Sequence, residues 1–344
     1  MRFSTVFVAM AALATTSSFT TAAPATTSTC TTTAPAPTST SGDNSTRPGG
    51  NSTRPGGNDT NIVTTALNYA LTLENLQAEF YTQGLAKFNE SAFTDAGFNA
   101  SAYGRFVEIG NQENEHVASL VTLIENLKGK PVPLCNYSFP MDNLTEFLTS
   151  ARALETTSVS AYLGAISDLN GNLSTNAASI AAVEARHAAY LNELWGQSPF
   201  PYAFDTPLSQ RAVATLASNF ITSCPFDIGV KPFAQLNATL PAAGSNSTMV
   251  STSFEGMSSN MTNSTWCQFL YGNKVMVSPR TECALPANLT GYVYVVVTKN
   301  KTPVSLMKDT NILAGPALLF NIFNGTSTNG TVTNGTMTNS TSFA

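Results

Sequence analysis

Charged residues are scarce in this 344-residue chain, because Asp, Glu, Lys and Arg make up 11% of it, against about a quarter of an ordinary soluble protein. The net charge is −5 and lysine and arginine form no run, so the composition argues against nucleic acid as a partner. The polar surface must instead come from uncharged Ser, Thr and Asn. Cysteine is limited to five residues, none of them at the spacing of a zinc site.

Long hydrophobic runs are also missing, and none approaches the roughly 20 residues of a transmembrane helix. A shorter apolar run, Val6–Ala14, follows Arg2 and precedes small residues at 21–23, which is the pattern of a secretory signal peptide. We therefore predict that residues 1–23 are a signal peptide and that the protein is secreted. Residues 329–344 are polar throughout, so we expect no GPI-anchor signal there.

Two segments of low complexity flank the rest of the chain. Residues 24–58 are rich in Thr, Ser and Pro and repeat the sequence NSTRPGG at 44–50 and 51–57. Such a segment cannot bury a core and is predicted to be disordered. Two interpretations stay open for it: a solvated linker, or a stalk that spans a cell wall and contacts its polysaccharide. Residues 324–344 are predicted to be a disordered, glycosylated tail.

N-glycosylation sequons are dense along the whole chain, which indicates a secreted protein that carries N-linked glycans. The asparagines are Asn44, Asn51, Asn58, Asn89, Asn99, Asn136, Asn143, Asn172, Asn237, Asn246, Asn260, Asn263, Asn288, Asn300, Asn324, Asn329, Asn334 and Asn339.

The cysteines fit an oxidising compartment. Cys30 lies in the predicted disordered segment, and the other four allow three pairings. We favour Cys135–Cys224 and Cys267–Cys283, because each bond then lies within one predicted domain. These domains are a helical bundle at 59–224 and a β-rich module at 225–323.

The fold class is predicted from periodicity. Four segments carry apolar residues at helical spacing: one from Asn61, one over 100–127, one after Asn143 and one from Gly171 to before Pro199. The connection 129–141 spans roughly 40 Å at about 3.3 Å per residue and can run the length of a bundle. A fifth helix is expected at 208–221. The β-branched and aromatic runs at 264–271, 291–298 and 317–323 predict strands. The chain is therefore predicted to be mainly α, a four-helix bundle plus a fifth helix, followed by a small β-rich module.

Each of the four long helices places a glutamate in its apolar stripe. Two of these glutamates are followed three residues later by the only two histidines of the chain. Residues three apart share one face of a helix, so each Glu-x-x-His pair can reach a single ligand. A tyrosine follows each of the other two glutamates by seven residues. The residues are Glu74, Glu113, His116, Glu155, Glu184 and His187, with Tyr81 and Tyr162.

Four carboxylates in one core require a counter-charge, because an unpaired buried carboxylate costs several kcal/mol. The apolar stripes contain no lysine or arginine, Arg186 lies beside its stripe, and two histidines cannot neutralise four carboxylates. Two divalent or trivalent metal ions can, and this set of oxygen and nitrogen ligands suits iron or manganese. The alternative is a bundle that keeps these residues but binds metal weakly or not at all.

The stretch LENLQAEFY at 73–81, the segment ENEH at 113–116, Glu155 and the segment EARH at 184–187 resemble the ferritin-like superfamily. Within it, they resemble the secreted desiccation-related and fungal stress-response proteins. The resemblance covers residues 60–225 and implies a ferritin-like four-helix bundle. It also implies that the six glutamates and histidines are the ligands of two Fe or Mn ions. Gln77 departs from the pattern, because relatives often carry a second glutamate there.

The resemblance leaves the activity open, because ferritin-like sites perform ferroxidase, oxygenase, peroxidase and catalase chemistry. Peroxide disproportionation regenerates its own metal state and suits an extracellular protein, with Tyr81 and Tyr162 in contact with the ligands. The competing interpretation is a secreted or cell-wall glycoprotein that uses the bundle as a non-enzymatic scaffold. An iron-storage cage is disfavoured, because glycans at Asn89, Asn99, Asn143 and Asn172 would obstruct shell packing.

Overall fold

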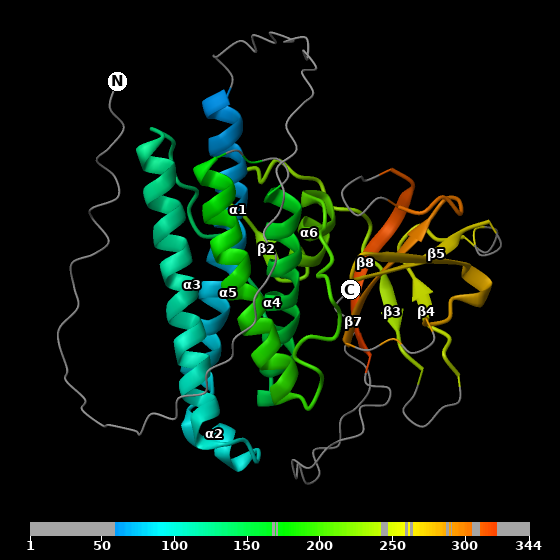
Figure 1. Ribbon diagram of the computed structural model, residues 1–344, viewed down its shortest axis with the longest axis horizontal. Coiled ribbons are helices and arrows are strands. Elements are labelled where there is room, and N and C mark those ends of the chain that lie inside the picture. The colour runs from blue at the N-terminus through cyan, green and yellow to red at the C-terminus, as the bar shows by residue number, and fades with distance from the viewer. Residues whose placement is uncertain are drawn as a thin grey trace, which may run out of the picture. The chain divides into compact units, whose positions relative to one another are not determined.

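The computed structural model describes residues 59–321, except 167–168, 170, 242–246, 259–260, 262–263, 287–288, 290 and 305–309. The predicted signal peptide, the repeat-containing segment with Cys30, and the C-terminal tail lie outside the described residues. Helices occupy the first part of the described chain and strands the second (Figure 1).

Four long helices form a bundle in which α1 and α3 make one antiparallel pair and α4 and α5 the other (Figure 1). Their bounds are α1 Asp59–Lys87, α3 Ala100–Asn126, α4 Leu144–Ile166 and α5 Asn172–Leu194. A short helix that the sequence did not predict, α2 (Glu90–Asp95), joins the first pair. The sequon residues Asn89 and Asn99 start α2 and α3, because their side-chain oxygens accept hydrogen bonds from free backbone N–H groups of the first turn.

The connection from α3 to α4 runs along the bundle, as its length predicted. Near its start, the Val132 N–H donates to Asn68 Oδ1 at 2.9 Å. At its end, the Glu146 N–H donates to Asn143 Oδ1 at 3.0 Å. Between them, β1 (Asn136–Tyr137) pairs antiparallel with β2 (Ile221–Ser223). The disulfide Cys135–Cys224 lies beside this pairing, as predicted.

The fifth predicted helix is present but shorter than expected. It is α6 (Gln210–Ala217), and the predicted end at Ile221 is wrong because that residue belongs to β2. Ser209 caps its start by accepting the Ala212 N–H at 3.3 Å. After α6 the chain enters β2, which pairs with β1, and Cys224 directly follows β2.

The β-rich part contains a four-stranded antiparallel sheet in the order β6-β5-β7-β8 and a two-stranded sheet of β3 and β4. The bounds are β3 Asn237–Thr239, β4 Ser251–Ser253, β5 Trp266–Tyr271, β6 Lys274–Pro279, β7 Gly291–Thr298 and β8 Ile312–Asn321. The predicted strands correspond to β5, β7 and β8, whereas β6 and the shorter strands were not predicted. Cys267 and Cys283 form the second predicted disulfide.

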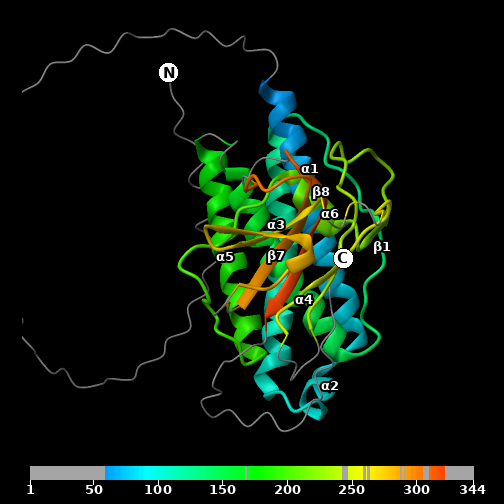
Figure 2. The same ribbon diagram turned by 90° about the vertical axis from the view of Figure 1, so that its right-hand side faces the viewer.

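Every residue of β7 is buried, because the sheet is covered on both faces. Alternate residues of a strand point to opposite faces. Tyr292 and Tyr294 join the core of the bundle, whereas Val293 and Val295 join a separate core of the β-rich part. The Tyr294 hydroxyl lies 2.8 Å from the Ser160 Oγ of α4. Figure 2 shows β7 and β8 in front of α4 and α6. Bundle and sheet therefore share a core.

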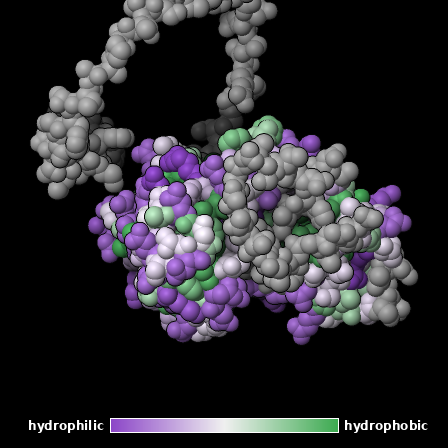
Figure 3. Space-filling view, turned by 90° about the horizontal axis from the view of Figure 1, so that it is seen from below, coloured by the Kyte–Doolittle hydropathy of each residue, from purple (hydrophilic) through white to green (hydrophobic). Residues whose placement is uncertain are grey.

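The described surface is polar but carries few charges. All sequon asparagines within the described residues are exposed, and they are Asn89, Asn99, Asn136, Asn143, Asn172, Asn237 and Asn300. Seen from the side of α2, the surface mixes hydrophilic and hydrophobic residues (Figure 3). Among the described helices, none has both the length and the hydropathy needed to cross a membrane.

Candidate metal centre

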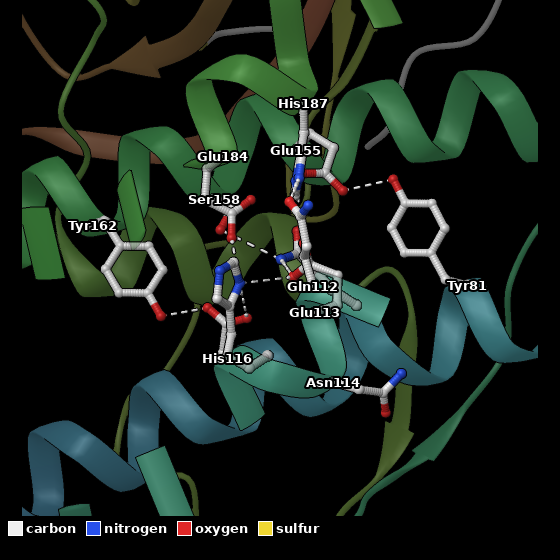
Figure 4. A network of polar contacts seen from close by, with 12 residues as sticks. Tyr81, Gln112, Glu113, Asn114, His116, Glu155, Ser158, Tyr162, Glu184 and His187 are labelled. Atoms are coloured by element: carbon white, nitrogen blue, oxygen red, sulfur yellow. Dashed lines mark hydrogen bonds and ion pairs between the residues drawn. The ribbon is translucent and has the colours of Figure 1, made fainter. Parts of the chain in front are cut away.

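The six glutamates and histidines predicted from the apolar stripes meet in the middle of the bundle (Figure 4). Each helix contributes at the point where its stripe crosses the bundle axis: α1 gives one glutamate, α4 gives one, and α3 and α5 each give a Glu-x-x-His pair. All four glutamates are at most 1% exposed. Helical spacing places each glutamate on the inner face of its own helix, and the packing of the four helices brings them together.

Their ligand atoms form two overlapping groups, in each of which all atoms lie within 4.8 Å of one another. One group contains Glu74 and His116, and the other contains Glu155 and His187. Glu113 and Glu184 belong to both. Two shared carboxylates between two histidine-containing groups is the arrangement of a carboxylate-bridged dinuclear site.

Several buried carboxylate oxygens at this position have no hydrogen-bond partner, namely Glu74 Oε2, Glu113 Oε1 and both oxygens of Glu184. His116 Nδ1 lies 3.3 Å from Glu184 Oε1 and 3.4 Å from Glu74 Oε2, in contacts that are not aligned as hydrogen bonds. A single N–H cannot serve several carboxylates at once, whereas a metal ion can. The donor set and its orphaned oxygens therefore fit two hard cations.

The orientation of the His187 side chain also suits a role as a metal ligand. Its Nδ1 lies 3.0 Å from Glu155 Oε2 and 3.2 Å from Glu113 Oε1. Its Nε2 lies 2.8 Å from Gln112 Oε1. An amide oxygen only accepts, so in the neutral imidazole the proton sits on Nε2 and the lone pair of Nδ1 faces the carboxylates. Gln112 could not be predicted from the sequence, because it lies outside the apolar stripe of α3 and far from His187 in the chain.

Gln77 takes part in the site without adding a charge. Its Nε2 donates to Glu113 Oε2 at 3.0 Å and to Ser158 Oγ at 3.4 Å. The residue that departs from the ferritin-like pattern therefore holds one of the two shared carboxylates in place.

Tyr81 and Tyr162 contact glutamates on opposite sides of the cluster (Figure 4). The Tyr81 hydroxyl donates to Glu155 Oε1 at 2.6 Å, and the Tyr162 hydroxyl donates to Glu74 Oε1. Burial, together with the neighbouring carboxylates, raises the pKa of both phenols well above the usual value. Both hydroxyls therefore stay protonated and act as hydrogen-bond donors.

The pKa values of the metal-free cluster are shifted so that several of its glutamates and histidines hold protons at the positions where cations would bind. Burial raises the pKa of Glu74 to about 7 and that of Glu184 well above its usual range. Burial lowers the pKa of both histidines, but the carboxylates outweigh it and raise the pKa of His116 to about 12 and that of His187 to about 9. For Glu113, burial is outweighed by both histidines, which lower its pKa to about 2. Metal binding would displace these protons.

Arg152 is a buried cation of α4 that lies outside the cluster. Its Nε donates to Asn192 Oδ1 at 2.6 Å, and its guanidinium lies 3.8 Å from the ring centroid of Phe320 in β8. Burial lowers its pKa to about 9. These contacts tie the bundle to the sheet, and they leave the four glutamates without an arginine counter-charge.

Comparison with known proteins agrees with this architecture. Residues 63–197 match the family model described as the ferritin-like domain. The chain is also similar to Protein rds1 of Schizosaccharomyces pombe, with 29% identity over 165 residues. That alignment covers 46% of this chain and 39% of the relative, so the chain spans less than half of the relative's length. The fold is a ferritin-like four-helix bundle with a β-rich C-terminal module.

Proposed function

We propose that this protein is a ferritin-like metalloprotein whose bundle holds two iron or manganese ions for redox chemistry on peroxide or oxygen. The observation that carries the proposal is the pair of overlapping ligand groups, which share Glu113 and Glu184 and leave buried carboxylate oxygens without partners. Glu74 and His116 would complete one ion's ligands, and Glu155 and His187 the other's.

Bound iron or manganese would supply the electron-transfer chemistry. The chain's own residues would position the ligands: Tyr81 and Tyr162 through the outer oxygens of two glutamates, Gln77 through Glu113, and Gln112 through His187. Among the candidate reactions, peroxide disproportionation converts two H₂O₂ to two H₂O and O₂, and it needs no further co-reactant. It is therefore the reaction we propose to test first.

We also propose that the protein is a secreted, stress-response-type glycoprotein. The support is the surface position of every described sequon asparagine and the two disulfides. The same observations favour the second candidate function, a glycan-covered scaffold at the cell surface or wall that contains little or no metal.

Metal stoichiometry tests the site most directly. Elemental analysis of protein purified from a secreting host should find two Fe or Mn per chain. Glu113→Gln removes a carboxylate common to both ligand groups and should lose both ions, whereas Glu74→Gln should lose mainly one. Glu115→Gln changes an exposed glutamate on the same helix and serves as the control that keeps both ions.

Activity is measured on the samples used for metal analysis. The two assays are oxygen evolution from peroxide and oxidation of added Fe²⁺. Metal-loaded protein that does neither would eliminate the redox function while leaving the site intact. Well under one metal per chain in the wild-type protein would overturn the site and favour the scaffold.

A further inference from the structure

A cavity of about 540 Å³ lies inside the bundle next to the glutamate–histidine cluster. It is lined by the first half of α1, the second halves of α3 and α4, and the first half of α5, with α6 and residues 228–230 at one side. These are the helix halves farthest from α2, and we call this part of the bundle the hollow end. Glu74 and Tyr162 form the wall that the cavity shares with the cluster.

At the hollow end, each helix pair packs mainly within itself, and the cavity lies between the two pairs. Leu67, Leu71 and Leu120 form an apolar cluster between α1 and α3. Tyr162 and Ala177 belong to a separate cluster between α4 and α5. Several of the lining positions are alanines, which leave space between the pairs unfilled. They include Ala66, Ala70, Ala161, Ala165 and Ala177.

The wall of the cavity is mostly apolar, and Glu74 is its charged residue. Among the described residues that line the cavity, Glu74 is the only Asp, Glu, Lys, Arg or His, and it is 1% exposed. Apart from Gly229, the exposed lining residues have uncharged polar side chains, and they mark where the cavity meets solvent. They are Thr65, Ser119, Asn176 and Gln210. The volume falls within the roughly 300–1,000 Å³ of pockets that hold small molecules.

These features select a chemical class of ligand. An apolar cavity favours an apolar occupant over water. A carboxylate or phosphate head group would find no lysine or arginine in the wall, and a buried ammonium group would lose its hydration. An uncharged polar head group can hydrogen-bond to the exposed Thr, Ser, Asn and Gln side chains. We propose that the cavity binds a neutral molecule with an aliphatic chain, such as a medium-chain alcohol.

Such a ligand would lie against Glu74, one of the residues of the candidate metal centre. The suggestion that this ligand is a substrate for the two metal ions rests on the proposed function. The binding of the ligand does not rest on it, because the cavity is lined by the helices and not by the ions. Binding can therefore be measured with and without metal.

The test is a calorimetric titration of the full chain with 1-decanol, decanoate and decyltrimethylammonium, in metal-free and metal-loaded protein. We expect one 1-decanol per chain in both forms, with binding of the two charged probes at least tenfold weaker. Ala70→Leu and Ala165→Leu place extra methyl groups in the cavity, and each should weaken 1-decanol binding at least tenfold without changing the metal content. Ala86→Leu, at an exposed position of α1, is the matched control and should bind like the wild type.

The outcomes separate the two proposals. Failure of the wild-type chain to bind 1-decanol, or equal binding by the wild type and both cavity variants, would overturn the cavity site whatever the metal content. Equal affinity for decanoate would overturn the neutral class of ligand. Binding of 1-decanol by a protein that takes up no metal would keep the cavity and remove the proposed metal function.

Discussion

The two ends of the bundle lie on opposite sides of one cluster of glutamates and histidines and are built differently. At the end capped by α2, which we call the packed end, Phe80, Phe88, Phe106 and Phe147 contact one another and Tyr81 at ring-centroid distances of 5.0–6.3 Å. At the hollow end, a cavity lies beside Tyr162, and five of its lining residues are alanines. The two ligand groups of the cluster contain the same residue types, three glutamates and one histidine each. The residues around the cluster therefore decide from which side a molecule can approach it.

The largest difference between the ends should appear on removal of a large side chain. Phe147 is fully buried and contacts several aromatic rings, so Phe147→Ala should lower the free energy of unfolding by about 3–5 kcal/mol. Leu67→Ala, beside the existing cavity, should cost less than about 2.7 kcal/mol, the low end for a buried leucine. Denaturant unfolding measures both, and equal costs would contradict the distinction between the ends.

The two tyrosines give the next largest effect. Tyr81→Phe and Tyr162→Phe each remove a hydrogen bond to a buried carboxylate, a bond worth about 1.5–3 kcal/mol. The cost should be near the top of that range at the packed end and lower at the hollow end, because Tyr162 borders the cavity and is 7% exposed, whereas Tyr81 is 0% exposed. The comparison uses metal-free protein and thermal unfolding. A larger loss of stability for Tyr162→Phe than for Tyr81→Phe would contradict this distinction between the two ends.

Enlarging an alanine sharpens the comparison further. Ala151 is 0% exposed and packs in the aromatic core, so Ala151→Leu should destabilise by about 1–3 kcal/mol. Ala70→Leu fills empty space and should change the free energy of unfolding by no more than about 0.5 kcal/mol, the range of a harmless substitution. Denaturant unfolding distinguishes them, and a loss as large at Ala70 as at Ala151 would show that the hollow end is already full.

The cluster between the ends should show the smallest effect, a pH dependence whose sign changes with metal. Glu74 and His187 have pKa values raised to about 7 and about 9, so the metal-free folded state binds more protons than the unfolded state and loses stability as pH rises from 5 to 9. The lowered pKa of Glu113, about 2, acts below this window. Metal-loaded protein holds deprotonated ligands, so its stability should rise between pH 5 and 7.

The expected change for metal-free protein is at least about 1 kcal/mol, or roughly 2–4 °C in melting temperature. Thermal scans at pH 5, 7 and 9, with chelator and with added metal, measure both slopes. Parallel slopes in the two forms would show that the cluster does not exchange protons for metal.

Much of the fold could be predicted from the sequence. Helical periodicity located the four long helices, and the prolines and length of 129–141 predicted the long connection. The glutamates stood out because a charged residue in an apolar stripe is a local signal that needs no tertiary information. The short helix α2 and the strand at Ile221 were not predicted, because their few residues take their conformation from packing and from the disulfide to Cys135.

The contacts across the bundle could not be predicted in the same way. Gln77 and Gln112 have no sequence feature that pairs them with Glu113 and His187, because the pairing depends on which helix faces which. Arg152 lies beside its apolar stripe, yet β8 covers it and buries it. Helical spacing fixes the face on which a residue lies but not the element that packs against that face.

The sequence by itself determined that four glutamates and two histidines would lie on the inner faces of four helices, because residues three and four apart share a helical face. Only the tertiary structure decided that these residues divide into two groups with two shared carboxylates. It also decided that one side of the cluster is filled by aromatic rings and the other adjoins a cavity. The spacing of helix pairs depends on the side chains of every facing helix at once, and no single stripe contains that information.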